Sequence, residues 1–121
     1  MAEVVVIVNP ENPVARLSRE QVVDIYMGRY SHFPDGSNAV PFDLSAEAAT
    51  RETYYEKLIS KSVAQVNAFW ARLRFSGRAS PPRELHDSDA AIMQVSRNRS
   101  AIAYVDSEHV NEKAKVVLRL P

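Results

Sequence analysis

Ser45, Thr50 and Arg51 bring two hydroxyls and a guanidinium to the point where a strand-like pattern gives way to a helical one. A helix that starts directly after a strand presents unpaired backbone amides at the positive end of its dipole, and α/β proteins bind phosphate groups at such junctions. Hydroxyl and guanidinium donors beside those amides would complete a site for an oxyanion. Ser45 or Thr50 could instead cap the helix, which contributes about 1 kcal/mol with no ligand present. The residues alone leave both interpretations open.

The interval from Lys57 to Arg83 is the one charge-asymmetric part of the chain, because it holds six basic residues and no acidic one. Basic side chains interleaved with Trp70 suit phosphate binding or stacking on single-stranded nucleic acid. However, Trp70 falls on an apolar helical stripe, whereas Arg72 and Arg74 fall on other faces, where solvent would cover them. A solvated helix face is therefore the simplest interpretation, and local anion binding ranks above nucleic-acid binding.

Other site chemistries find little support in the sequence. The three histidines, His32, His86 and His109, have no partner at a metal-ligand spacing, and the chain contains no cysteine. Nucleophile-elbow, zinc-protease, P-loop and dinucleotide-binding motifs are also missing. The carboxylates of Asp87 and Asp89 would lie in a first helical turn, where they complement the helix dipole. We therefore expect no catalytic residue, no metal and no cofactor.

Length and composition describe an ordinary globular chain. Its 121 residues suit one domain, which we place at residues 1–121, with 45% hydrophobic and 25% charged residues. Fifteen basic and fifteen acidic residues cancel, so no global field attracts nucleic acid or a membrane surface. No apolar run approaches the roughly 18 residues of a membrane span.

Four apolar strands separated by helices are predicted. The strands are Val4–Val8, Ala39–Leu44, Ala101–Val105 and Val116–Leu120. One helix follows the capping box at Ser18 and ends at Gly28, a second starts near Ser45, a third follows the capping box at Ser62, and a fourth is capped by Asp87 or Ser88. Pro81 and Pro82 indicate an exposed linker. This order predicts an α/β fold, a three-layer arrangement with a mainly parallel sheet flanked by helices.

A third set of motifs runs from Leu17 to Arg29 (LSREQVVDIYMGR) and is followed by an aromatic residue and Pro34-Asp35-Gly36. This order resembles that of periplasmic phosphate-binding proteins of ABC transporters, which have an L-S/T-x-x-Q-L-x-x-I-F/Y-x-G-K signature. Phe75 to Arg78 and Ser100 to Val105 look like the family's glycine-rich turn and its G-A-I-G-Y-V strand. The resemblance extends from Val4 to Val117 and implies a non-catalytic, exported binding protein, of which this chain matches about one lobe of the type 2 fold.

The phosphate loop of that family is altered here. The resemblance implies an R-x-D-G-S-G-T run, but if Asp43 takes the place of its Asp, Pro41 stands where the Arg belongs and only Ser45 survives of Gly-Ser-Gly-Thr. In that register, Glu47 would repel a bound anion. A register with a longer loop places Thr50 and Arg51 at the helix start and restores a hydroxyl and a charge, and we prefer it.

We therefore predict a module that binds phosphate or a related oxyanion and serves phosphate uptake, with Thr50 and Arg51 as side-chain donors. Asn9, at the end of the first strand, and Arg78 are expected at the same sheet edge, because ligands in open α/β sheets gather at strand C-termini. One lobe leaves the ligand half exposed, so we expect a homodimer, a second lobe or a permease as partner.

Two further expectations concern location and a rival function. The chain enters a strand directly after Met1-Ala2-Glu3, as an exported protein would if a start methionine replaced its leader, and we expect a periplasmic location. The alternative function is a regulatory or interaction domain that has lost the ligand and docks a partner through Tyr30 and Phe33.

Overall fold

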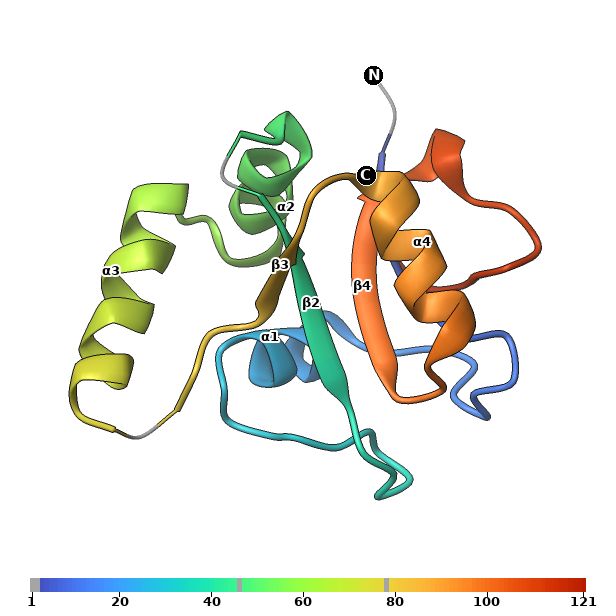
Figure 1. Cartoon of the computed structure of the whole chain (residues 1–121), viewed down its shortest axis with the longest axis horizontal. Helices are drawn as coiled ribbons and strands as arrows, with labels where there is room; N and C mark the ends of the chain where they lie inside the picture. Colours follow the sequence, from blue (N-terminus) through green and yellow to red (C-terminus); the bar gives the residue numbers. More distant parts are fainter. Residues whose placement is uncertain (1–2, 46, 78) are drawn as a thin grey trace.

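The computed structural model describes residues 3–45, 47–77 and 79–121, which form a five-stranded sheet with helices on both faces (Figure 1). The strands are β1 (Val4–Val8), β2 (Val40–Leu44), β3 (Arg83–Leu85), β4 (Ala101–Asp106) and β5 (Lys115–Leu120). The helices are α1 (Arg19–Tyr26), α2 (Ala49–Ile59), α3 (Val63–Phe75), α4 (Ser88–Arg97) and the short 3-10 helix η1 (Ser107–His109).

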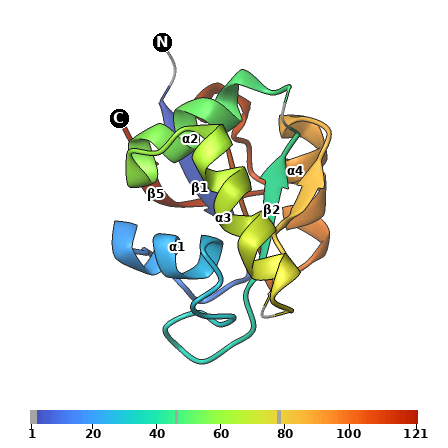
Figure 2. The ribbon, with the colours of Figure 1, turned by 90° about the vertical axis from the view of Figure 1, so that its left-hand side faces the viewer.

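The elements form three layers, which are clearest in the view of Figure 2. Helices α1 and α2 lie on one side of the sheet and α4 lies on the other, while α3 packs against α2 at the border of the domain. The predicted α/β class with a sheet between helical layers is therefore confirmed.

The sheet is mixed rather than mainly parallel in its pairing. Its strand order is β3-β2-β4-β1-β5, with parallel pairing of β2 to β3 and to β4. Strand β1 pairs antiparallel with both β4 and β5, so it alone runs opposite to the other four strands. A fully buried run of β-branched residues fits any central strand, so the sequence of β1 did not reveal its direction.

Strand β3 was not predicted, because the region looked like a linker. It has only three residues, it follows Pro81 and Pro82, and it pairs with β2 alone at the border of the sheet. Proline is tolerated next to such an edge strand because an edge leaves backbone amides unpaired.

Helix starts follow the predicted caps except at α2. The capping boxes at Ser18 and Ser62 form, and Asp87 caps α4 by accepting a hydrogen bond from the Ala90 amide. Helix α2 begins later than predicted, with Ala48 as its N-cap residue, and no side chain caps it. Neither Ser45 nor Thr50 takes that role.

A cluster of four tyrosines forms the centre of the layer between the sheet and helices α1 and α2. Tyr26, Tyr54, Tyr55 and Tyr104 are fully buried, and the rings of Tyr54 and Tyr104 stack with their centroids 3.6 Å apart. The Tyr26 hydroxyl donates to the carbonyl oxygen of Phe42 on β2 at 2.7 Å, which ties α1 to the sheet.

Several apolar side chains of α3 and α4 are not fully buried. Met93 of α4 is 44% exposed, while Phe69 and Leu73 of α3 are partly buried. Helix α3 contacts the rest of the molecule over a narrow surface, so only Val66 and Trp70 of its apolar residues reach the core. No helix in the described ranges has the length and apolar character needed to cross a membrane.

Candidate functional site

A cavity of about 240 Å³ opens at the sheet edge where β2 and β4 end. Helices α2 and α4 both start at this edge, at the top of the view in Figure 1, so two positive dipole ends converge on it. The lining consists of the last residue of β2, the first turns of the two helices, and the end of β4 with η1: Leu44, Ala48, Ala49, Thr50, Asp87, Ser88, Asp89, Asp106 and His109.

The polar groups of this edge cavity include both donors and acceptors. The Thr50 hydroxyl donates to Asp106 Oδ2 at 2.9 Å, which links the first turn of α2 to the end of β4. Asp87 already accepts from the Ala90 amide, and Asp89 lies in the first turn of α4. The cavity therefore combines two helix starts, which attract an anion, with three carboxylates, which repel it.

Arg51 lies in the same turn of α2 as Thr50, but its side chain extends away from the edge cavity. Its side chain is 5% exposed and lies between β2, β3 and α3. There Nη2 donates to Asn67 Oδ1 at 2.8 Å, and Nη1 lies 3.5 Å from Glu84 Oε2. The guanidinium predicted as an anion donor thus pairs with protein groups.

Asp43 is the buried acidic partner of Arg51, with Arg51 Nε 3.6 Å from Asp43 Oδ1. The carboxylate also accepts hydrogen bonds from the Tyr104 hydroxyl, from the Leu44 amide at 2.9 Å and from the Tyr55 hydroxyl at 2.6 Å. Burial, followed by the negative charge of Asp43, raises the pKa of Tyr55 and of Tyr104 well above the usual value. Asp43 therefore organises the sheet side of α2 and does not line the edge cavity.

Asn9 lies at the opposite end of the sheet, so the expectation that it approaches the same edge is wrong. Because β1 runs against β4, Val8 pairs with Ile102 at the start of β4. The Asn9 amide donates to the carbonyl oxygens of Val95 and Ser96 at 2.9 and 3.2 Å and so secures the end of α4.

The remaining predicted residues are placed as follows. Ser45 directly follows β2, and its amide donates to the Leu85 carbonyl oxygen at 2.9 Å, but its side chain does not line the edge cavity. Glu47, which one register placed beside the anion, is exposed and does not line the cavity either. Arg78 lies outside the described residues.

Side chains of β4 and η1 offer one grouping that could hold a metal ion. Single ligand atoms of Asp106, Glu108 and His109 all lie within 4.8 Å of one another. Glu108 and His109 are exposed, and exposed acidic groups are common on protein surfaces. The grouping was missed because the three residues do not follow a known metal-binding motif.

Two other features of the cavity went unrecognised in the sequence. Asp106 directly follows the buried residues Ala101 to Val105, and a polar residue at the end of a parallel strand is a signal that could have indicated it. The carboxylates of Asp87 and Asp89 were interpreted as a helix cap and as partners of the helix dipole, and not as groups that line a cavity. The start of α4 lies opposite the start of α2 because of the order of the strands in the sheet. This order cannot be read from the sequence.

Comparison with solved structures identifies the fold. No protein-family model and no curated protein matches the sequence. An ABC-type phosphate transport receptor from Vibrio cholerae superposes with a TM-score of 0.75 at 18% identity, over 96% of this chain and 45% of that one. A putative phosphate ABC transporter substrate-binding protein with bound phosphate from Clostridium perfringens superposes with a TM-score of 0.77 at 19% identity. The match covers 96% of this chain and 44% of that one. A possible phosphate binding protein from Planctomyces limnophilus superposes with a TM-score of 0.70 at 14% identity, over 96% of this chain and 40% of that one.

The chain spans less than half the length of these solved structures. It therefore has the fold of a single lobe of a phosphate ABC transporter substrate-binding protein.

Proposed function

We propose that this chain is a binding lobe for phosphate or a related oxyanion, and that the edge cavity between α2 and α4 is its site. The observation that carries the proposal is the start of α2, which opens on the cavity with an alanine as N-cap residue and no capping side chain. Such a helix start is a natural place for an anion. The fold shared with phosphate receptors supports the same ligand class.

The carboxylates of the cavity favour a protonated oxyanion. Asp87, Asp89 and Asp106 line it, and an ionised carboxylate only accepts hydrogen bonds. Phosphate near neutral pH carries P–OH groups that can donate to a carboxylate, whereas sulfate carries none. A fully ionised anion would meet repulsion of the order of a few kcal/mol from each nearby carboxylate at an effective dielectric constant near 20. We therefore expect phosphate to be preferred over sulfate.

Arg51 and Asn9 do not belong to this site as we propose it. Arg51 is paired with Asp43, Glu84 and Asn67, and Asn9 lies at the far end of the sheet. The donors are instead the amides at the start of α2 and the hydroxyl of Ser88, while the Thr50 hydroxyl holds the Asp106 carboxylate at the cavity.

A ligand in this open edge cavity would be covered on one side only. A second surface is therefore needed for tight binding, supplied by a second copy of the chain, another lobe or a permease. Within this proposal the chain acts outside the cytoplasm in phosphate uptake, performs no catalysis and binds no nucleic acid.

The alternative of a docking loop around Tyr30 and Phe33 is less well supported. Phe33 is fully buried and closes the core, so only Tyr30, 55% exposed, could contact a partner.

Thermal unfolding in phosphate tests the proposal. A ligand at a thousand times its dissociation constant stabilises the fold by about 4 kcal/mol. We expect tens of millimolar phosphate to raise the Tm more than sulfate at equal ionic strength, and Thr50→Val to weaken this shift. Thr53→Val is the matched control, because Thr53 lies one turn further along α2 and donates only to the Ala49 carbonyl oxygen. Equal responses to phosphate and sulfate would contradict the expected preference for phosphate, and no response to phosphate would overturn the proposal.

A further inference from the structure

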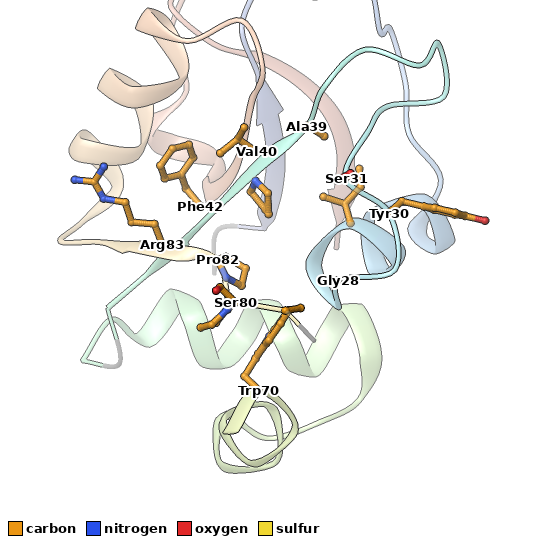
Figure 3. Close-up of a pocket in the computed structure, with 14 residues that line it drawn as sticks. Gly28, Tyr30, Ser31, Ala39, Val40, Phe42, Trp70, Ser80, Pro82 and Arg83 are labelled. Atoms are coloured by element: carbon orange, nitrogen blue, oxygen red, sulfur yellow. The ribbon is translucent and has the colours of Figure 1, made fainter. Parts of the chain in front are cut away.

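A second recess lies on the α3 side of the sheet, away from the edge cavity. Two cavities of about 430 and 320 Å³ share Trp70, Pro81 and Pro82 as lining residues, and together we call them the Trp70 groove. Figure 3 shows the larger one, with Trp70 rising from α3 and Val40 and Phe42 on β2, while Tyr30 points away from it. Each cavity is large enough for a small organic ligand, and so are the two together.

The smaller cavity forms a polar end with an excess of hydrogen-bond donors. Trp70 Nε1 is a buried N–H group with no hydrogen-bond partner among the described residues, and Arg51 Nε faces Asp43 Oδ1 at 3.6 Å, too far for a normal hydrogen bond. Both residues are more than nine-tenths buried, and both line this cavity. Buried donors without acceptors are uncommon in proteins and require an explanation. A ligand that only accepts hydrogen bonds would supply one.

Two positive and two negative side chains line the polar end. They are Arg51 and Arg74, with Asp43 and Glu84 as the acidic groups. The negative charge of Asp43 is offset by Arg51, whose Nε lies 3.6 Å from Asp43 Oδ1. Glu84 is different, because its side chain is 52% exposed and its Oε2 lies 3.5 Å from Arg51 Nη1. A ligand carboxylate could replace Glu84 at that nitrogen.

The larger cavity forms an apolar end that would hold the body of the ligand. Its lining includes Ile25 of α1, the indole of Trp70 and the prolines Pro41, Pro81 and Pro82. The Val40 and Phe42 side chains project from the other face of β2 (Figure 3). We propose that the Trp70 groove binds a small carboxylate with an aromatic or aliphatic body, the carboxylate lying near Arg51 and Arg74 and the body against Trp70.

The fluorescence of Trp70 reports on this binding directly, since the chain contains one tryptophan. Three probe molecules separate the contributions of the carboxylate and of the apolar body. 4-Phenylbutyrate has both, 4-phenylbutanol has the body alone, and acetate has the carboxylate alone. We expect a saturable change of the emission with 4-phenylbutyrate, and apparent dissociation constants at least tenfold weaker for the other two. Equal responses to 4-phenylbutyrate and 4-phenylbutanol would show a merely hydrophobic recess and overturn the proposal.

Two neighbouring arginines of α3 provide a matched pair of variants. Both are exposed, but Arg74 lines the groove and Arg72 does not. Arg74→Gln should weaken 4-phenylbutyrate binding about fivefold, as expected for one partly exposed ion pair, and Arg72→Gln should leave it unchanged. Equal effects of the two substitutions would contradict the proposed position of the carboxylate.

Glu84→Gln provides a test in the opposite direction. If Glu84 competes with the ligand for Arg51 Nη1, removing its charge should tighten 4-phenylbutyrate binding severalfold. Unchanged or weaker binding would overturn the proposed exchange. The groove and the edge cavity are lined by different residues, so the phosphate response of the Tm should persist in Arg74→Gln whichever way this test falls.

Discussion

Arg51 in the first turn of α2 and Asp43 on β2 form a buried ion pair, with Arg51 Nε 3.6 Å from Asp43 Oδ1 and side chains that are 5% and 4% exposed. If Asp43 takes the place of the Asp in the family's phosphate loop, the resemblance implies an arginine at position 41, where this chain has proline. The guanidinium that faces Asp43 comes from α2 instead. The pair fixes the first turn of α2 against the sheet, and so it positions the helix start at the edge cavity.

Asp43→Asn should lower the free energy of unfolding by about 3–5 kcal/mol, because the Arg51 charge would remain buried without its acidic partner. Chemical denaturation followed by Trp70 fluorescence measures this loss. Asp24→Asn is the control, since Asp24 pairs with Arg29 at the surface and its loss should change stability by about 1 kcal/mol or less. Similar losses for the two variants would mean that the buried pair contributes no more than a surface one.

Gly28→Ala should destabilise the fold more than Gly36→Ala does. Both glycines have positive φ, 79° and 89°, so either substitution strains the backbone by about 1 kcal/mol or more. At Gly28 an added Cβ would also lie 2.9 Å from Trp70 Cη2, whereas at Gly36 it would meet nothing within 4 Å. The difference between the two free energies of unfolding therefore measures the contact with Trp70, and equal values would show that the ring moves aside freely.

The buried tyrosine cluster predicts a loss of stability at alkaline pH. Burial is the largest cause that raises the pKa of Tyr26, Tyr54, Tyr55 and Tyr104. In the unfolded chain these phenols ionise near pH 10, so their contribution is fully present below that pH and is lost as the pH rises above it. Each buried tyrosine should steepen the fall in stability by about 1.4 kcal/mol per pH unit.

Denaturation series at several pH values above 9 measure this slope. Tyr104→Phe should reduce the slope of stability against pH by the contribution of one buried tyrosine. Phenolate absorbance from these four tyrosines should appear only together with unfolding. If it rises while the protein is still folded, the cluster is more accessible than the structure implies.

The sequence predicted most elements because their signals are local. The capping boxes at Ser18 and Ser62 and the apolar run Val4–Val8 depend on neighbouring residues, and the structure has them where they were predicted. The direction of β1 and the existence of β3 depend on pairing between distant segments, which leaves no local pattern. For the same reason Asn9 was assigned to the wrong end of the sheet.

The site was only partly predictable, because the role of a side chain depends on what lies opposite it. The sequence correctly placed Thr50 and Arg51 in the first turn of a helix at the sheet edge. It did not indicate that Asp106 would accept from Thr50, or that Asp43 and Glu84 would surround Arg51. These partners come from β2, β3 and β4, whose order in the sheet decides which groups meet.

A phosphate titration followed by amide NMR shows both whether the anion binds and where it binds. We expect phosphate, but not sulfate at the same ionic strength, to shift the amide resonances of Ala49, Thr50 and Asp89 at the edge cavity, with much smaller shifts at Asn9 and on α3. The absence of saturable shifts at the edge cavity, or larger shifts on α3 than at the start of α2, would contradict this expectation.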